Sequence, residues 1–134
     1  MSTFHLRIST PDGLQFEGEV ERLRVRMIDG DVSILARHSD YVSAVGVGEA
    51  AVVLEDGSVR KAACIGGMLT MIKNEANLIA TTFEWADEID LARAERAKAA
   101  AEARIEAAKE DARELMLAKA KLQRALVRIG VKAE

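Results

Sequence analysis

Hydrophobic and polar residues alternate strictly along the first part of the chain. Between residues 4 and 9, Phe4, Leu6 and Ile8 are each followed by a polar side chain. Residues 22–27 repeat the pattern, with a leucine, a valine and a methionine on one face and three arginines on the other. Alternation with a period of two is typical of β-strands that bury one face. We therefore predict that the amino-terminal part is built from strands.

Turn residues divide this strand-like region into short pieces. The tripeptide at 11–13, Pro-Asp-Gly, ends the first piece. Asp56-Gly57 predicts a hairpin with a type I′ turn, and the segment KNEAN at 73–77 predicts a second hairpin with asparagines at its corner. Further glycines predict bends or a close approach of two backbones, at Gly46, Gly48, Gly66 and Gly67. About eight to ten short strands at this spacing favour an antiparallel sandwich or a flattened barrel.

The period of two stops at Trp85, and helical sequence continues without a breaker to Gly130. Asp87 is expected to cap the new helix, with Asp90 completing a pair like a capping box, and Gly130 is expected to end the helical region. Alanine, the strongest helix former, occupies 7 of the 12 residues from 97 to 108.

The second half of this tail has a larger apolar stripe, which consists of Leu115, Ala118, Leu122, Ala125 and Ile129. The segment Asp111–Glu114 has the form of a second capping box, which favours two helices connected near residues 109–111. One continuous rod is equally compatible, because neither glycine nor proline enforces a corner. The predicted fold class is thus α+β, with an antiparallel β-sandwich at 1–84 and a helical hairpin, able to extend, at 85–134.

Composition and charge exclude several classes of protein. The single cysteine, Cys64, excludes an internal disulfide and suits a reducing compartment. No basic leader precedes the first strand, and no apolar run is long enough to span a membrane. Residues 1–84 carry 8 basic and 12 acidic side chains, whereas residues 113–132 carry 6 basic side chains and one acidic. The carboxy-terminal segment is therefore locally electropositive on an acidic molecule, whose net charge is −3.

The sequence contains no arrangement that indicates catalysis or metal binding. His5, His38 and Cys64 lack the spacing of a metal site, and no nucleophile–base motif or phosphate-binding loop is present. The basic segment lacks the aromatic residues that stack on bases, and its Leu122 and Ile129 are needed for packing, so binding of nucleic acid or a membrane surface is disfavoured. The three arginines of residues 22–26 indicate a solvated strand face or, alternatively, the rim of a partner site.

Five segments together resemble the epsilon subunit of bacterial F-type ATP synthase. They are TPDG at 10–13, GDVSILARH at 30–38, GGMLTM at 66–71, ADEIDLARA at 86–94 and KLQRALVRI at 121–129. The resemblance covers essentially the full length and implies a non-catalytic subunit of the rotating central stalk. It implies the gamma subunit, the c-subunit ring and the alpha and beta subunits as partners. It also implies a peripheral position on the cytoplasmic face of the cell membrane, reached only through the complex, and no required cofactor. The coupling ion, proton or sodium, is left open.

The resemblance also implies that the loop Asp29–Tyr41 contacts the c ring and the gamma subunit. Its candidate contact residues are Asp29, Asp31, Arg37, His38 and Asp40. The family usually has a glycine where this chain has Ser33, and a Pro-Gly-His-x-Pro loop where it has residues 36–40 without either proline. We therefore expect this loop to be less rigid here.

The segment IDLARA at 89–94 matches the pattern of family members that bind regulatory ATP between the two helices. The residues implied in such a site are Ile89, Asp90, Arg93, Ala94, Arg124 and Arg128. The arginine fork suits phosphate oxygens. Ala100 replaces a further arginine of the ATP-binding relatives, and a helix cap with ordinary ion pairs is the alternative interpretation.

Family members commonly restrain ATP hydrolysis by extending the hairpin toward the catalytic subunits. In this chain the attraction to an acidic partner is expected to come from Lys119, Lys121, Arg124 and Arg128. Two other classes of function stay open on the sequence alone: a free-standing ATP sensor and a coiled-coil adaptor unrelated to rotary enzymes.

Overall fold

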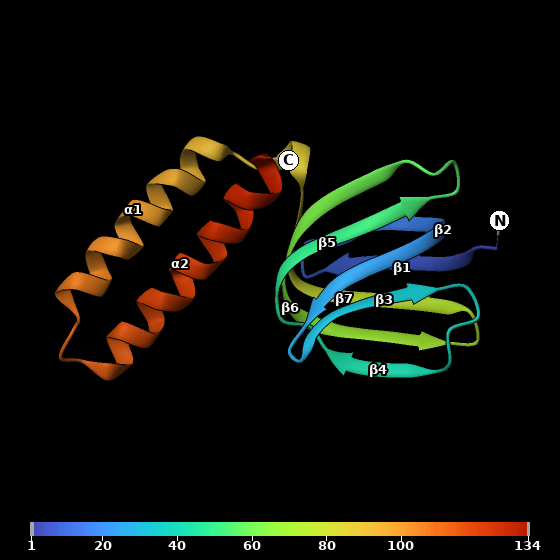
Figure 1. Ribbon diagram of the computed structural model, residues 1–134, viewed down its shortest axis with the longest axis horizontal. Helices are drawn as coiled ribbons and strands as arrows, with labels where there is room; N and C mark the ends of the chain where they lie inside the picture. Colours follow the sequence, from blue (N-terminus) through green and yellow to red (C-terminus); the bar gives the residue numbers. More distant parts are fainter. Residues whose placement is uncertain (1, 134) are drawn as a thin grey trace. The chain divides into compact units, whose positions relative to one another are not determined.

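The computed structural model describes residues 2–133, which form two compact units divided between Trp85 and Ala86. The first unit is a β-sandwich and the second is a pair of helices (Figure 1). The predicted fold class is confirmed, and the chain adopts the hairpin rather than the continuous rod.

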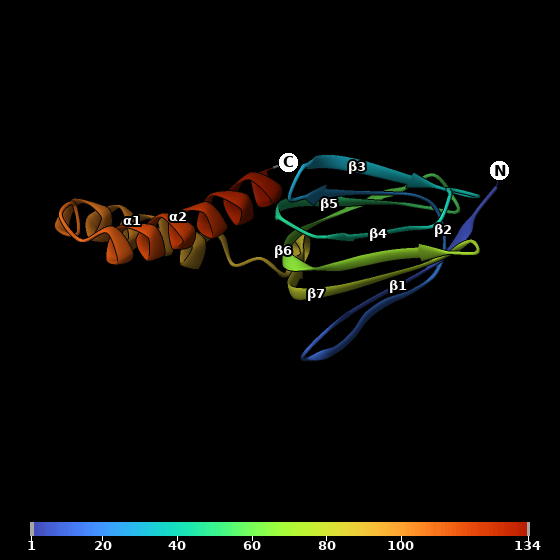
Figure 2. The same cartoon turned by 90° about the horizontal axis from the view of Figure 1, so that it is seen from below.

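The sandwich contains seven strands in the described residues. They are β1 (Phe4–Thr10), β2 (Gly13–Met27), β3 (Gly30–Leu35), β4 (Tyr41–Ala44), β5 (Val47–Leu54), β6 (Val59–Ile72) and β7 (Glu75–Trp85). Their order is β1-β7-β6-β5-β2-β3, with β4 beside β6, and β1 also pairs with β2. All pairs are antiparallel except β1–β7, which is parallel. Figure 2 views the sandwich along its layers, with β3 and β5 in one layer and β1 and β7 in the other.

The expectation of eight to ten short strands was wrong because two strands are long and change partners along their length. β2 pairs with β1 through its first half and with β3 and β5 through its second half. β6 pairs with β5 before Gly66 and with β4 after Gly67. Each long strand therefore contributes to both layers, which turn signals alone could not indicate.

The bend of β6 depends on Gly66 and Gly67, whose φ angles are 69° and 120°. These angles lie in the region that side chains with a Cβ disfavour. A Cβ on Gly67 would overlap the carbonyl oxygen of Ile79. The predicted close approach of two backbones is confirmed at this position.

Alternating residues of the strands fill a continuous core, as the period of two predicted. Phe4, Leu6 and Ile8 of β1 are fully buried, and so are Leu23 and Val25 of β2. At the end of β7, Trp85 packs edge-on against Phe83 and Phe16, and the Arg60 guanidinium lies 3.8 Å from the centre of its ring.

Both predicted hairpins form, but the type I′ geometry occurs at the second turn and not at Asp56-Gly57. The turn after β5 is not type I′, because only Gly57 of its residues has a positive φ, and the Gly57 N–H donates to the Leu54 carbonyl at 2.9 Å. That bond closes a four-residue turn over residues 54–57, and Gly57 then forms the glycine bulge of a three-residue hairpin loop. Lys73 and Asn74 both have positive φ, as a two-residue type I′ turn requires.

The second unit consists of a 3₁₀ turn η1 (Ala86–Glu88) and the helices α1 (Leu91–Ala107) and α2 (Ala112–Ala133). Asp90, not Asp87, caps α1, because the 3₁₀ turn displaces the helix start by three residues. Asp111 accepts from the Arg113 and Glu114 N–H groups, so the second cap is confirmed. The expected end at Gly130 was wrong, since α2 continues to Ala133.

The helices lie side by side and run in opposite directions (Figure 1). Their facing positions are small, because Ala94, Ala101, Ala118 and Ala125 are all buried. The apolar stripe of α2 is confirmed, with its leucines and Ile129 half-buried between these alanines. Alanines permit close approach of two helices but bury little apolar area per residue.

Candidate interaction sites

The candidate contact loop is divided by a strand. Asp29 and Asp31 lie where β2 turns into β3, whereas Arg37, His38 and Asp40 follow the far end of β3. The structure therefore does not bring the five residues together, because β3 extends between the two groups.

At the acidic end, ion pairs connect Asp31 to the arginine face of β2. Asp31 lies 3.9 Å from both Arg24 and Arg26, and Arg24 also donates to Glu49 at 2.7 Å. Lys61 approaches the same Glu49 oxygen at 3.8 Å. The arginines are therefore part of a charge network across β2, β3, β5 and β6. Such exposed or partly exposed pairs contribute little stability individually.

At the other end of β3, the β6–β7 turn is hydrogen-bonded to the loop that follows the strand. The Arg37 N–H donates to the Asn74 side-chain oxygen at 2.7 Å. The Lys73 N–H donates to Asp40 at 3.2 Å, and His38 packs edge-on against Tyr41. Arg37 itself has a φ of 63°, a conformation that a glycine in this position would adopt more readily.

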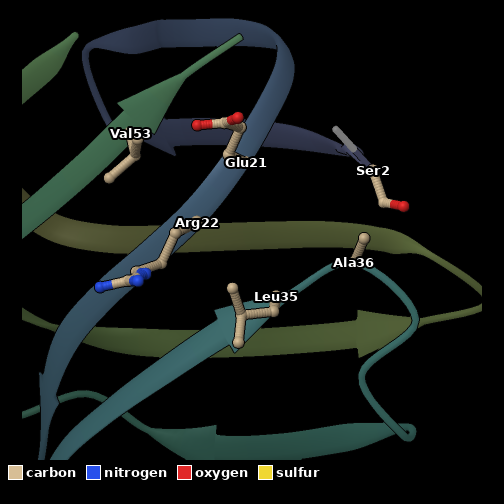
Figure 3. Close-up of a pocket in the computed structure, with 6 residues that line it drawn as sticks. All are labelled: Ser2, Glu21, Arg22, Leu35, Ala36 and Val53. Carbon is tan, nitrogen blue, oxygen red and sulfur yellow. The ribbon is translucent and has the colours of Figure 1, made fainter. Parts of the chain in front are cut away.

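A surface hollow of about 370 Å³ lies beside this end of β3 (Figure 3). Its lining residues are Ser2, Glu21, Arg22, Leu35, Ala36 and Val53. The hollow joins β2, β3 and β5, which are distant in sequence at this point, so no local motif could have indicated it.

The IDLARA segment forms the start of the helical hairpin. Ile89 and Ala94 are buried, Asp90 and Arg93 are exposed, and the Asp90 carboxylate accepts from the Arg93 N–H at 3.0 Å. Arg124 and Arg128 are half-buried on α2. Because the helices are antiparallel, the first turn of α1 lies near the carboxy-terminal half of α2, so the six residues share one region of the hairpin.

The basic residues of α2 lie on more than one side of the helix. Lys119 and Lys121 are exposed, unlike the half-buried arginines at 124 and 128. Three large apolar side chains of the same helix are also exposed: Met116, Leu117 and Leu126. The sequence analysis did not single out this mixture of exposed lysines and apolar residues. In the sequence, these three apolar residues stand outside the Leu115–Ile129 series.

Sequence analysis also missed a titratable cluster on the sandwich. The His5 ring lies between Glu17, at 2.9 Å from Nε2, and Glu19, at 3.2 Å from Nδ1. Hydrogen bonding to Glu17 is the main cause that raises the pKa of His5 above its ordinary value, with a smaller contribution from Glu19. The observation that reveals this cluster is the register of β1 with β2, which sets His5 opposite Glu19.

Two family models together match nearly the whole chain. The beta-sandwich domain of the ATP synthase delta/epsilon chain matches residues 3–86, and the long alpha-helix domain of the same chain matches residues 87–133. The chain belongs to the ATP synthase delta/epsilon chain family. The resemblance to an epsilon chain, an accessory subunit rather than the catalytic one, is thereby confirmed.

Relatives in this family align with this chain over three quarters or more of their lengths. The ATP synthase epsilon chain of Ruminococcus albus is 40% identical over 98% of this chain and 97% of its own. That of Halalkalibacterium halodurans is 36% identical over 98% of both chains. The sodium-ion-specific ATP synthase epsilon chain of Acetobacterium woodii is 35% identical over 77% of both.

The fold of this delta/epsilon chain also recurs in a solved assembly. A chain in the Euglena gracilis mitochondrial ATP synthase (OSCP/F1/c-ring) superposes with a TM-score of 0.86, at 17% identity, over 100% of this chain and 83% of that one. Within residues 2–133, no helix has both the length and the apolar character needed to cross a membrane.

Proposed function

We propose that the chain serves as the epsilon subunit in the central stalk of a rotary F-type ATP synthase. The observation that carries this proposal is the alignment of both units, over at least 97% of each chain, with the epsilon chain of Ruminococcus albus. The subunit contributes no catalytic residues and helps to couple ion movement to ATP synthesis.

The proposed partners are the gamma subunit, the c-subunit ring and the alpha and beta subunits. The chain would then lie peripherally at the cytoplasmic face of the membrane, and only through the complex. The coupling ion in this proposal is either the proton or sodium, because one relative is named sodium ion specific.

The sandwich, residues 1–84 in the expected division, is the proposed anchor to the gamma subunit and the c ring, through the Asp29–Tyr41 loop. Both ends of β3 carry charges on exposed side chains, at Asp31 and Asp40. Rim charges of this kind set register and encounter more than affinity.

The hairpin, residues 85–134, is the proposed regulatory part. Extension would present Lys119, Lys121, Arg124 and Arg128 to an acidic surface of the catalytic subunits and obstruct ATP hydrolysis. Regulatory ATP, held by Asp90, Arg93 and the two arginines of α2, would favour the closed hairpin by mass action. The alanine-rich contact between the helices supports a small free-energy difference between closed and extended states.

Co-purification tests the proposal against its two competitors. An affinity-tagged chain expressed in its own cells should recover alpha, beta and gamma subunits in one complex. Binding of nucleotide without these subunits would instead identify an ATP sensor, and recovery of unrelated helical proteins alone would identify an adaptor.

A further inference from the structure

A polar contact at the open end of the hairpin joins α2 to the turn that precedes α1. The Nζ of Lys132, in the last turn of α2, donates to the backbone carbonyl of Ala86 at 3.1 Å. The same carbonyl accepts the N–H of Ile89 at 3.3 Å, so the contact fastens α2 to the turn η1 that precedes α1.

Each partner of this contact has a buried apolar residue close to it in the sequence. Ile89 is 4% exposed and Val131 is 2% exposed, although they belong to opposite ends of the hairpin sequence. Along the rest of the interface, alanines provide the fully buried side chains. Within residues 86–133, the buried side chains larger than alanine are therefore Ile89 and Val131, near the end that Lys132 joins.

The other end of the hairpin cannot separate, because the chain connects the helices there. Four residues, 108–111, join α1 to α2, and an exposed pair between Arg104 and Glu114 at 3.3 Å lies beside them. Helix separation must consequently begin at the open end, where Lys132 and Ala86 meet.

We infer that Lys132 is a latch whose contact with the Ala86 carbonyl sets the fraction of closed hairpin. Opening leaves a charged ammonium group in water, where it is well solvated, so the latch is weak enough to release. It is strong enough to matter because hydrogen bonds to charged groups are stronger than neutral ones. The latch itself is independent of the proposed function, whereas its effect on ATP hydrolysis rests on it.

The test measures helix separation in the full-length isolated chain. Spin labels are attached to cysteines introduced at Glu95 and Gln123, which are exposed on α1 and α2. The native Cys64 can stay, because burial raises the pKa of its thiol to about 12 and leaves it unreactive. Pulsed distance measurements then give the fraction of molecules with separated helices.

Lys132→Met keeps the length of the side chain and removes its donors. We expect the ratio of separated to closed hairpin to rise roughly tenfold, the lower end of what loss of one hydrogen bond to a charged group gives, because Lys132 is only half-buried. Lys132→Arg keeps donors and charge and should restore closure. Lys121→Met, an exposed lysine on the same helix, and Glu114→Gln, at the connected end, should leave the ratio unchanged.

A ratio that Lys132→Met raises no more than Lys121→Met would overturn the latch, provided that far-ultraviolet circular dichroism shows equal helix content. The assembled ATP synthase supplies a separate readout. Lower ATP hydrolysis with Lys132→Met supports both the latch and the proposed inhibition. An opened hairpin with unchanged hydrolysis supports the latch and contradicts the proposed inhibition.

Discussion

The carboxylate of Asp90 accepts the backbone N–H of Arg93 at 3.0 Å, so two residues implied in an ATP site already close the first turn of α1 together. One Asp90 oxygen is engaged by the cap, while the Arg93 side chain is exposed. Replacement of Asp90 by alanine would therefore remove two interactions at once: the helix cap, which contributes about 1 kcal/mol to stability, and any contact with the ligand. Asp90→Ser retains a capping oxygen and separates the two.

For regulatory ATP, we expect the melting temperature of the helical signal to rise with millimolar ATP, because a ligand of the folded hairpin stabilises it. Arg93→Ala should abolish the rise, and Asp90→Ser should reduce it without lowering helix content. Arg96→Ala, an exposed arginine one turn along, is the matched control. An ATP response that persists in Arg93→Ala would assign the IDLARA segment a structural role only.

Truncation after Lys109 should raise ATP hydrolysis by the assembled enzyme while the sandwich still holds the subunit in the complex. Alanine at the four basic positions of α2 should reproduce much of this activation, and more strongly at low ionic strength, because salt screens exposed charges. Alanine at Arg96 and Lys98 of α1 controls for general loss of charge. Equal hydrolysis rates in truncated and intact enzymes would exclude inhibition by the tail.

The two ends of β3 allow the proposed c-ring contact to be tested separately. Asp31→Lys removes the partner of Arg24 and Arg26, and Asp40→Lys removes an acceptor of the Lys73 N–H. Each single change should lower ion pumping per ATP hydrolysed only mildly, and the double change more, with the catalytic head intact. Glu55→Lys, in the exposed β5–β6 turn, is the control. Unaltered pumping in vesicles carrying the double variant would exclude both ends.

His5 predicts a pH dependence of sandwich stability. Its pKa is raised above 6.5, mainly by Glu17 and then by Glu19; Glu75 of β7 and Arg7 of its own strand are its other charged neighbours. A raised pKa means that the stabilisation is complete below the unfolded value and is lost as pH rises through the folded value. His5→Gln should therefore destabilise the chain at about pH 5.5 and have little effect at about pH 8.5. Fluorescence of Trp85, the single tryptophan, monitors unfolding of the sandwich in denaturant.

Gly13 and Gly67 have similar φ angles but different surroundings. Replacing each by alanine therefore distinguishes the cost of backbone strain from the cost of steric overlap. Gly13 has a φ of 121° and open space around its position, whereas Gly67 has a φ of 120° and the Ile79 carbonyl where a Cβ would stand. Gly13→Ala should cost about 1–2 kcal/mol of unfolding free energy, and Gly67→Ala about 3 kcal/mol or more. Equal losses, measured by denaturant titration, would mean that β6 adjusts without cost at the bend.

Residue patterns predicted the elements better than their connections. Alternation located the buried faces of β1 and β2, and the Asp111 cap located the start of α2. By contrast, the bending of β2 and β6 between layers is decided by partners far away in sequence. Both Asp87 and Asp90 have the residue type of a helix cap, and their spacing alone does not show that a 3₁₀ turn places the cap at Asp90.

The candidate sites were predictable to the extent that they are local. IDLARA is contiguous, so its residues share one region of the hairpin. The loop Asp29–Tyr41 is contiguous too, but β3 divides its charges between two ends. The His5 cluster and the hollow beside Leu35 depend on strand register and were not predicted.

The parallel pairing of β1 with β7 affects how the protein is made. β1 can pair with β2 soon after both strands are synthesised, but its other edge finds its partner only after residues 75–79 have been synthesised. Contacts of such large sequence separation slow folding. During that interval the free edge of β1 is exposed to pairing with other chains, a known route to aggregation. The helices of the hairpin can pair without this delay, since α2 follows α1 after only a few residues.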